Sequence, residues 1–464
     1  MKLILSNNIV VKEPTQAVRL FCKNRLVIDN PDYITRERLG KWTGTIPRYL
    51  HLYEENSGDL ILPFGCRRNA EFLEIVKGCS VTWTEYKPER DFRADFQSSI
   101  NLYPYQENAV KAMLAARNGV VVMPCGSGKT QTALECVARL GLKTLWLTHT
   151  QDLLKQSMER AKACFGCDND SYGTITEGKI DIGKNITFAT VQTMQKLDFP
   201  RYRKEWAVIV VDECQHCCGS PTKVSQFYRV LSNLYAPYKF GLTATPHRAD
   251  GLDKSMYALL GDIIIAIPRK EVEHMTCPVE VKIINTEYEP DIDFITNGDG
   301  TINYSGLVVD IINSKQRFDK VISVINEQCK SYAIVLANRV QYLQDLQKKY
   351  TGKSVCISAV KSKKEKEERA NALKMLNSGE IDCIFATYKL AAEGLDCPNL
   401  KYVVFATPEK DERTIIQAIG RAARKAKGKE CGTVIDLVDE FGMYKNWAKK
   451  RQTYYKKLKC SIKY

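Results

Sequence analysis

The sequence has no long apolar run and no recognisable export signal. None of its 464 residues lies in an apolar stretch approaching the roughly 20 residues that span a bilayer. The N-terminus, MKLILSNNIVVKEP, holds only a short apolar segment interrupted by Asn7 and Asn8. This pattern argues against a signal peptide. We therefore expect a protein of the cytoplasm that makes no use of a membrane.

Cysteine is plentiful but forms no framework, because the 17 cysteines are odd in number and scattered. Without an export signal they are expected to be reduced thiols. Two groups leave a zinc or iron–sulfur site open as an alternative: the Cys164–Cys167 pair, and the cluster of Cys214, Cys217 and Cys218. Cys214 lies inside a motif that we assign below to a nucleotide cleft, so free thiols are favoured.

Acidic residues are outnumbered, with 54 Asp and Glu against 68 Lys and Arg, for a formal net charge of +14. Such a balance suits binding to a polyanion such as nucleic acid. A lysine-rich proteome would give the same number, so the charge alone does not identify a partner.

The strongest local signal is Val120–Thr130, which reads VVVMPCGSGKT. An apolar strand runs into a loop of small residues and then into Gly128-Lys129-Thr130 at the start of a helix. This is the context of a phosphate-binding loop. Lys129 would reach the β- and γ-phosphates, and the Thr130 hydroxyl would bind Mg²⁺. Met123 departs from the pattern at its first small position.

A second apolar strand, Val208–Val211, ends in Asp212-Glu213 about 80 residues after the phosphate loop. At this separation the pair is typical of a Walker B motif. Asp212 would hold Mg²⁺, and Glu213 would act as general base toward the attacking water. Further on, Phe240–Pro246 (FGLTATP) places two threonines after a strand, where they would sense the state of the nucleotide.

The second half of the chain carries Gln417–Arg424 (QAIGRAAR), which predicts a helix with Arg421 and Arg424 on one face. Two arginines facing a cleft would bridge a γ-phosphate. An exposed basic helix is the alternative for this segment taken alone.

Short apolar strands alternate with helical segments twice, which predicts two parallel-sheet α/β domains. The fold class is therefore α/β, with two parallel-sheet domains in tandem, which the resemblance given below implies are RecA-like, and a small α+β accessory domain in front. The predicted boundaries are 1–95 for a DNA-binding accessory domain, 96–265 for the first ATP-binding domain, 266–312 for a linker and hairpin, and 313–464 for the second domain. Within the linker, Asn297–Gly300 predicts a tight hairpin turn.

The segment Lys445–Tyr464 holds eight Lys and Arg and no acid, interleaved with aromatic residues. It predicts a basic amphipathic helix. A solvated terminal helix and a nucleic-acid contact are both open interpretations of it.

The order of these motifs resembles that of superfamily 2 helicases and translocases over about residues 100–440. The resemblance implies ATP and Mg as cofactors and assigns roles to residues. The catalytic residues would be Lys129, Asp212, Glu213, Arg421 and Arg424. The nucleotide would be bound by Gln106, which reads adenine, and by Gly126, Ser127, Gly128, Lys129, Thr130, Gln417, Gly394 and Asp396. Nucleic acid would meet Thr150, Gln151, Thr190, Gln192 and Thr387, and the metal would be held by Thr130 and Asp212.

Within this superfamily the chain resembles the XPB/UvsW type. Arg248-Ala249-Asp250 is similar to the Arg-Glu-Asp element of XPB-type helicases, and the N-terminal GKWTGTI and LPFG patterns are similar to the front domain of the phage enzymes. The segment Asp212-Glu213-Cys214-Gln215-His216, called motif II in this superfamily, has Gln215 where that branch usually has His. Either Gln215 or His216 would couple the nucleotide to the second domain.

The resemblance implies an ATP-dependent DNA helicase or translocase of bacteriophage type, acting on forks and Holliday junctions in replication, recombination or repair by branch migration. We expect a monomer that works with a single-strand-binding or recombination protein. An RNA helicase, the motor subunit of a restriction or transcription-repair complex, and a scaffold with a degenerate NTPase site are the alternatives.

Overall fold

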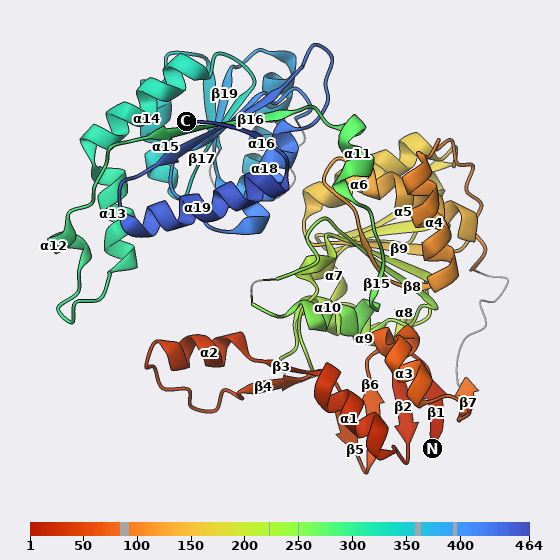
Figure 1. Ribbon diagram of the computed structural model, residues 1–464. Helices are drawn as coiled ribbons and strands as arrows, with labels where there is room; N and C mark the ends of the chain where they lie inside the picture. The colour runs from red at the N-terminus through yellow and green to blue at the C-terminus, as the bar shows by residue number, and fades with distance from the viewer. Residues whose placement is uncertain (84–91, 222, 249, 358–362, 393–396) are drawn as a thin grey trace. The chain divides into compact units, whose positions relative to one another are not determined.

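The computed structural model describes residues 1–83, 92–221, 223–248, 250–357, 363–392 and 397–464. The chain divides into two compact units, Met1–Pro268 and Arg269–Tyr464 (Figure 1). Each unit contains its own parallel sheet and its own hydrophobic core. The predicted fold class is confirmed: two parallel-sheet α/β domains follow a small α+β domain.

The small N-terminal domain is built on a five-stranded sheet of order β5-β6-β2-β1-β7. Its strands are β1 (Lys2–Leu5), β2 (Ile9–Lys12), β5 (Glu54–Asn56), β6 (Asp59–Leu62) and β7 (Ser80–Trp83). Helices α1 (Gln16–Arg25) and α3 (Ala70–Ile75) contact each other through Phe21 and Phe72, whose ring centroids are 5.4 Å apart. A separate pair, β3 (Val27–Asp29) and β4 (Tyr49–His51), is joined by α2 (Pro31–Arg38), and the short helix η1 (Phe64–Arg68) follows β6.

The rest of the first unit is an eight-stranded sheet of order β11-β10-β12-β9-β13-β14-β8-β15. Every pairing is parallel except that of β10 with β11. The strands are β8 (Asn118–Val122), β9 (Thr144–Thr148), β10 (Tyr172–Thr176), β11 (Lys179–Asp181), β12 (Ile186–Thr190), β13 (Val208–Asp212), β14 (Tyr238–Thr243) and β15 (Ile263–Ala266). Residues 208–212 are all buried, as expected for a parallel strand covered on both faces.

Helices cover both faces of this sheet (Figure 1). One face carries α4 (Pro104–Ala116), α5 (Lys129–Leu140) and α6 (Gln151–Cys164). The other carries α7 (Val191–Met194), α8 (Phe199–Tyr202), α9 (Gln226–Asn233) and α10 (Asp253–Leu260), with the short helix η4 (Cys214–His216) after β13. Another short helix, η3 (Asn169–Ser171), precedes β10. Because the strands are parallel, their carboxyl ends share one edge, and the loops that follow them meet there.

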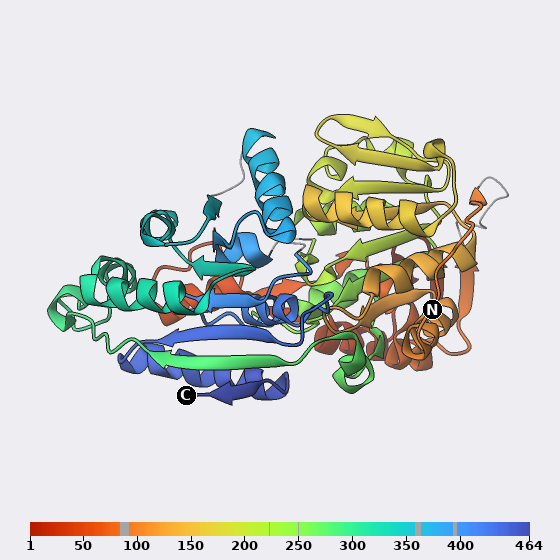
Figure 2. The same cartoon turned by 90° about the horizontal axis from the view of Figure 1, so that it is seen from above.

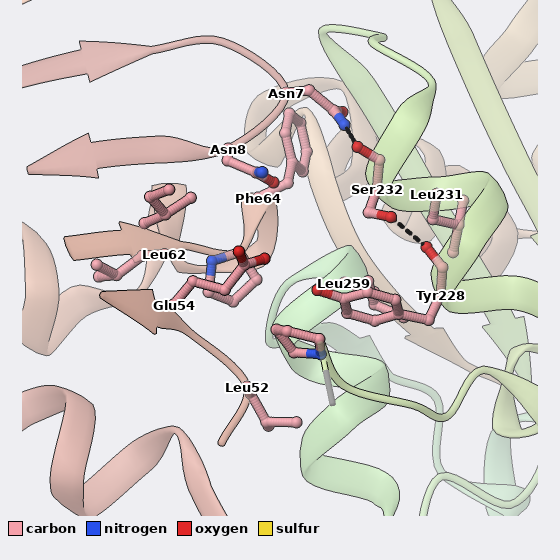
Figure 3. A pocket seen from close by; sticks show the side chains of 13 residues that line it. Asn7, Asn8, Leu52, Glu54, Leu62, Phe64, Tyr228, Leu231, Ser232 and Leu259 are labelled. Carbon is pink, nitrogen blue, oxygen red and sulfur yellow. Dashed lines mark hydrogen bonds between the residues drawn. The ribbon is translucent and has the colours of Figure 1, made fainter. Parts of the chain in front are cut away.

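The N-terminal domain packs on the first sheet domain through a buried lysine on β14. The ammonium of Lys239 donates hydrogen bonds to Asn7 Oδ1 at 2.9 Å and to the carbonyls of Leu231 and Leu234 at 3.0 Å each. It lies 4.2 Å from the centroid of the Phe64 ring. Figure 3 shows Asn7 reaching across to Ser232, to whose carbonyl it donates a further hydrogen bond. Burial lowers the pKa of Lys239 to about 7.

The second unit contains a seven-stranded, fully parallel sheet of order β18-β19-β17-β20-β21-β16-β22. Its strands are β16 (Val279–Asn285), β17 (Ala333–Ala337), β18 (Ser354–Ile357), β19 (Cys383–Thr387), β20 (Tyr402–Phe405), β21 (Gly432–Val438) and β22 (Ser461–Lys463). Helices α14 (Lys315–Gln328) and α15 (Val340–Lys349) cover one face. The other face carries α16 (Lys363–Ser378), α17 (Tyr388–Ala392), α18 (Glu412–Ala422) and α19 (Gly442–Lys457).

The segment 266–312 differs from the prediction of a linker and hairpin. It begins with the short helices α11 (Arg269–Val272) and η5 (Glu273–Met275) and ends with α12 (Ile292–Ile295) and α13 (Tyr304–Asn313). Between them lies β16, which pairs in parallel with β21 and β22 (Figure 2). The predicted tight turn is present, since Gly300 has φ +78° and its N–H donates to the Asn297 carbonyl at 2.9 Å. A strand therefore occupies the middle of the expected linker.

The basic C-terminal segment also differs from a solvated helix. Arg451 of α19 is 1% exposed and forms a two-pronged pair with Asp436 of β21, at 2.9 and 2.7 Å. The hydroxyl of Tyr455 donates to the same carboxylate at 2.7 Å. One face of α19 is thus part of the core of the second unit, because a buried aspartate on β21 requires a cation. Lys449 and Lys450 lie on the exposed face.

No disulfide joins any of the 17 cysteines, all of which lie within the described ranges. Within the described ranges, no three His, Cys, Asp or Glu side chains are grouped to hold a metal ion. Among the same residues, no helix combines the length and the apolar character that crossing a membrane requires.

Candidate nucleotide and nucleic-acid sites

The phosphate loop occupies the turn between β8 and α5. Gly126 and Gly128 adopt φ values of +80° and +78°, a left-handed region that favours glycine. The loop is fixed to the neighbouring strand, because Met123 N–H donates to the Thr243 carbonyl at 2.9 Å. Helix α5 begins at Lys129, so the N–H groups of its first turn lack intrahelical acceptors and are available to an anion.

Lys129 and Thr130 stand at the first two positions of α5. The ammonium of Lys129 donates to the Met123 carbonyl of its own loop at 3.4 Å. Lys129 supplies positive charge beside the N–H groups at the start of α5, and a triphosphate needs both, so the residues present fit a nucleotide. Ser127 is buried, and its hydroxyl donates to the Pro124 carbonyl at 2.7 Å, which closes the loop.

Asp212 ends β13 two strands away from the phosphate loop in the same sheet. Its carboxylate accepts a hydrogen bond from the Glu213 N–H at 3.0 Å. Burial, together with the neighbouring Glu213 charge, raises the pKa of Asp212 to about 7, while the Lys129 ammonium lowers it. A buried carboxylate of this kind fits a divalent cation. Mg²⁺ held by Asp212 and the Thr130 hydroxyl would neutralise phosphate charge.

Glu213 is held in an unusual conformation by its neighbours. Its φ of +51° is uncommon for a residue with a side chain and is typical of functional sites. The Gln215 amide donates to Glu213 Oε2 at 2.7 Å, and its oxygen accepts from the Thr243 hydroxyl at 2.7 Å. Gln215 is fully buried. Gln215 thereby joins motif II to Thr243-Ala244-Thr245, the segment called motif III. Which of Gln215 and His216 couples the nucleotide to the second domain remains a prediction.

His216 points elsewhere, since its ring lies 4.0 Å from that of His149 in the loop after β9. Beside it, Arg248 donates to the Gln215 carbonyl at 2.7 Å and pairs with Asp250 at 2.6 Å. These contacts tie the segment after motif III to the segment after motif II.

Gln106 contacts the phosphate loop. Its amide nitrogen donates to the Ser127 carbonyl at 2.9 Å, and its oxygen accepts from the Tyr103 N–H at 2.9 Å. The Tyr105 hydroxyl donates to the same Ser127 carbonyl at 3.0 Å. Gln106 thus supports the loop in this conformation, and its predicted contact with adenine remains a prediction.

The candidate nucleic-acid residues of the first unit lie at the carboxyl ends of two adjacent strands. Thr148 and Thr190 are paired in register on β9 and β12. Beyond them, Gln192 donates to the His149 carbonyl at 2.7 Å, and Gln151 donates to the Thr176 hydroxyl at 3.2 Å. Thr150 accepts from the Leu153 N–H and so caps α6. The Thr190 hydroxyl lies 3.1 Å from that of Thr193.

The sheet order separates these residues from the nucleotide loop. Strands β9 and β12 lie on one side of β13, and β14 and β8 lie on the other. Asp212 therefore stands between the two groups at one sheet edge.

In the second unit, Gln417 and Arg421 lie four residues apart on α18 and are half-buried. The prediction that Arg424 shares their helical face is wrong, because α18 ends at Ala422 and Ala423 caps it. The segment before β16 causes this ending: Cys277 N–H donates to the Ala423 carbonyl at 2.8 Å, and Thr276 forms a bridge with Arg424. The phosphate-bridging role of both arginines remains a prediction.

Thr387 ends β19, and its hydroxyl accepts from the Leu390 N–H at 3.4 Å. Gly394 and Asp396 lie outside the residues that the structure describes.

Sequence reasoning missed Lys239, the buried lysine under the N-terminal domain. A charged residue directly before the apolar segment Phe240–Leu242 was the available signal. It also missed Arg317, fully buried against Asp439 at 2.8 Å in the second unit.

Family comparisons match both halves of the chain. The model for the type III restriction enzyme res subunit matches residues 99–248, and the model for the helicase conserved C-terminal domain matches residues 316–426. Together they cover more than half of the chain.

Two relatives and one solved structure are similar to this chain over most of its length. Helicase L396 of Acanthamoeba polyphaga mimivirus is 25% identical over 374 residues, which are 78% of this chain and 69% of that protein. The DNA 3'-5' translocase XPB2 of Sulfurisphaera tokodaii is 26% identical over 378 residues, 74% of this chain and 82% of that protein. The structure of Dbp5 from S. cerevisiae, bound to RNA and ADP BeF3, aligns with a TM-score of 0.55 and 16% identity, covering 79% of this chain and 89% of that one.

These findings define an ATP-dependent motor enzyme with two RecA-like domains. The chain belongs to the superfamily 2 helicases, with relatives among the XPB-type enzymes. The predicted superfamily is confirmed.

Proposed function

We propose that this helicase is a DNA translocase that remodels branched DNA, such as forks and four-way junctions, in replication, recombination or repair. The observation that carries the ATP-driven motor is the chain of hydrogen bonds that runs from the phosphate loop through Thr243, Gln215 and Glu213 to Asp212. The similarity to a DNA translocase and the net charge of +14 support DNA as the substrate.

In the proposed mechanism, ATP with Mg²⁺ is the fuel. Lys129 and the first turn of α5 hold the β- and γ-phosphates, and Glu213 accepts a proton from the attacking water. Arg421 and Arg424 of the second domain offset the charge that develops on the γ-phosphate. Hydrolysis then changes how the two domains engage each other, which advances the motor along the strand.

The residues proposed to contact the DNA are Thr150, Gln151, Thr190, Gln192 and Thr387. Their hydroxyl and amide groups suit contacts with the phosphate backbone, which carry no sequence information. Gln192 already donates to the His149 carbonyl, and the Thr190 hydroxyl is hydrogen-bonded to that of Thr193, so these loops are held in position before DNA arrives.

An RNA helicase is the second candidate, because the aligned Dbp5 structure is bound to RNA. A motor subunit of a restriction complex is a third, since the first domain matches the res-subunit family model. Cleavage by such a complex would need a partner protein.

The test is ATP turnover and strand separation on a matched panel: a fork, a four-way junction, a simple overhang, single-stranded DNA and RNA of the same sequences. We expect the fork and the four-way junction to be processed fastest. Equal activity on the simple overhang would remove the preference for branched DNA, and stimulation by RNA alone would replace DNA as the substrate.

A further inference from the structure

A groove of about 1270 Å³ lies in the first unit, between the N-terminal domain and the loop that follows motif III. Its N-terminal wall comes from α1, β3, α2 and β4, and its other wall from residues 250, 251 and 254. None of the candidate residues named above for ATP or nucleic acid lines it. The groove is therefore separate from the strand ends that carry those residues.

Positive charge is left uncompensated in this groove. Lys23, Arg38 and Lys254 line it and are exposed, and among the described residues none of the three has an ion-pair partner. Arg19 is paired with Glu55 at 2.8 Å, and the groove's Asp250 is paired with Arg248 at 2.6 Å. Within the described part of the chain, the groove lining therefore presents these three cations and one acid without an ion pair, Asp29.

Aromatic rings stand in the same groove. Tyr49 is 48% exposed on β4, and the Arg48 guanidinium lies 5.8 Å from its ring centroid. Tyr53, two residues beyond His51, contacts the His51 ring edge-on at 5.6 Å. Exposed rings beside unpaired cations are the combination that single-stranded nucleic acid requires, because bases stack on the rings while phosphates meet the cations.

The groove wall continues into the catalytic segment. Asp250 holds Arg248, and Arg248 donates to the carbonyl of Gln215 at 2.7 Å. The Gln215 side chain in turn contacts Glu213. An occupant of the groove thus lies at the start of a short chain of contacts that ends at the proposed general base.

We propose that this groove binds the single-stranded arm of a DNA junction, with bases stacked on Tyr49 and phosphates held by Lys23, Arg38 and Lys254. The inference rests on the proposed DNA-remodelling function. In this proposal the N-terminal domain binds one strand of the junction. It also places that strand where it contacts the loop after motif III.

The test replaces the three cations together, in a Lys23→Ala/Arg38→Ala/Lys254→Ala variant. The matched control is Lys2→Ala/Arg203→Ala/Arg229→Ala, three exposed cations of the same unit that do not line the groove. Each variant loses three positive charges. Affinity for a fluorescent fork with a single-stranded arm is measured by anisotropy across a salt series.

We expect the groove variant to bind the fork at least about tenfold more weakly than the wild type. The slope of log affinity against log salt concentration should become shallower by about 2, because each lost contact with a single strand removes about 0.7 from it. The control should stay within about threefold of the wild type. Tyr49→Ala should weaken fork binding by about fivefold or more without changing the salt slope, because it removes only stacking.

Equal weakening by the groove and control variants would overturn the proposal, since net charge alone would then explain the loss. Unchanged fork affinity in the groove variant would also overturn it and would point to an acidic protein as occupant. The proposed function is judged separately, on the wild type: if no DNA stimulates its ATP turnover, that function fails. If stimulation is present and only the groove variant behaves as wild type, the groove assignment alone fails.

Discussion

The side chain of Gln215 is hydrogen-bonded to Glu213, with the amide nitrogen 2.7 Å from the carboxylate oxygen. Its other end accepts from Thr243 at 2.7 Å. The contact with Thr243 is buried and the contact with Glu213 is partly buried, so leaving either hydrogen bond unmet would be costly. Motif II is thereby joined to motif III within the first domain.

Gln215→Ala should lower the turnover number for ATP by about tenfold to a hundredfold, because a general base that loses its support is misplaced for the water it activates. The affinity for ATP should change by less than about twofold, since Gln215 does not touch the phosphate loop. Steady-state kinetics and nucleotide binding separate the two effects. Gln215→His is measured alongside Gln215→Ala. Higher turnover in Gln215→His than in Gln215→Ala would support a linking role for this side chain, whereas wild-type turnover in Gln215→Ala would contradict it.

Gly128→Ala should abolish most ATP turnover. A Cβ at Gly128 would lie 2.4 Å from the Gln106 amide nitrogen, which is committed to the Ser127 carbonyl. The matched control is Gly58→Ala, because Gly58 has a φ of +85° and no atom within 4 Å of an added Cβ. Both changes carry the left-handed penalty of about 1 kcal/mol in unfolding free energy. Only Gly128→Ala should reduce ATP turnover, by at least about tenfold, and equal turnover in the two variants would argue against the loop assignment.

Lys239 gives the first unit a defined pH dependence. Its pKa is lowered to about 7 by burial. Between pH 7 and the pKa of an unfolded lysine, near 10.4, the unfolded chain binds a proton that the folded chain lacks. Stability should therefore rise with pH across that window, by up to about 1.4 kcal/mol per pH unit.

The measurement compares denaturant unfolding of the wild type and of Lys239→Met at pH 7.5 and pH 9. The wild type should gain about 2 kcal/mol relative to the variant. If the difference in unfolding free energy between the wild type and Lys239→Met does not change with pH, Lys239 is charged in its site at both pH values. Its three acceptors and the Phe64 ring would then stabilise the ammonium.

Arg451→Ala should destabilise the second unit by about 3–5 kcal/mol, because it leaves the Asp436 carboxylate buried without its cation. Lys449→Ala, on the exposed face of the same helix, should change stability by less than about 0.5 kcal/mol. Thermal unfolding monitors both. Similar stability of the two variants would mean that α19 is held at the surface by weak contacts.

The sequence predicted strands best where apolar runs are continuous. The predicted strand Val208–Val211 lies within the observed β13, because a parallel strand covered on both faces needs apolar residues throughout. The prediction failed at Val279–Asn285, where apolar and polar residues alternate and the strand's partners, β21 and β22, are more than a hundred residues away.

In the candidate site, too, features set by the local sequence were predicted and features set by contacts between distant segments were not. Motif order located Lys129, Asp212 and Glu213 because each ends or follows a strand at one sheet edge. The partners of Gln106 and the end of α18 before Arg424 depend on contacts between distant segments. Spacing within one segment carries no information about them. Lys239 was missed for the same reason, since its three acceptors come from two other parts of the chain.

The central claim is that Glu213 activates water for an ATP-driven DNA motor. Its most direct test measures ATP turnover by the wild type and by Glu213→Gln, with and without single-stranded DNA, alongside binding of ATP and of DNA. We predict that DNA stimulates the wild type, that Glu213→Gln lowers turnover by about 10²–10⁴ and that this variant still binds both ligands. Lys129→Ala should lose turnover with weakened ATP binding. Hydrolysis by Glu213→Gln at the wild-type rate would contradict the account.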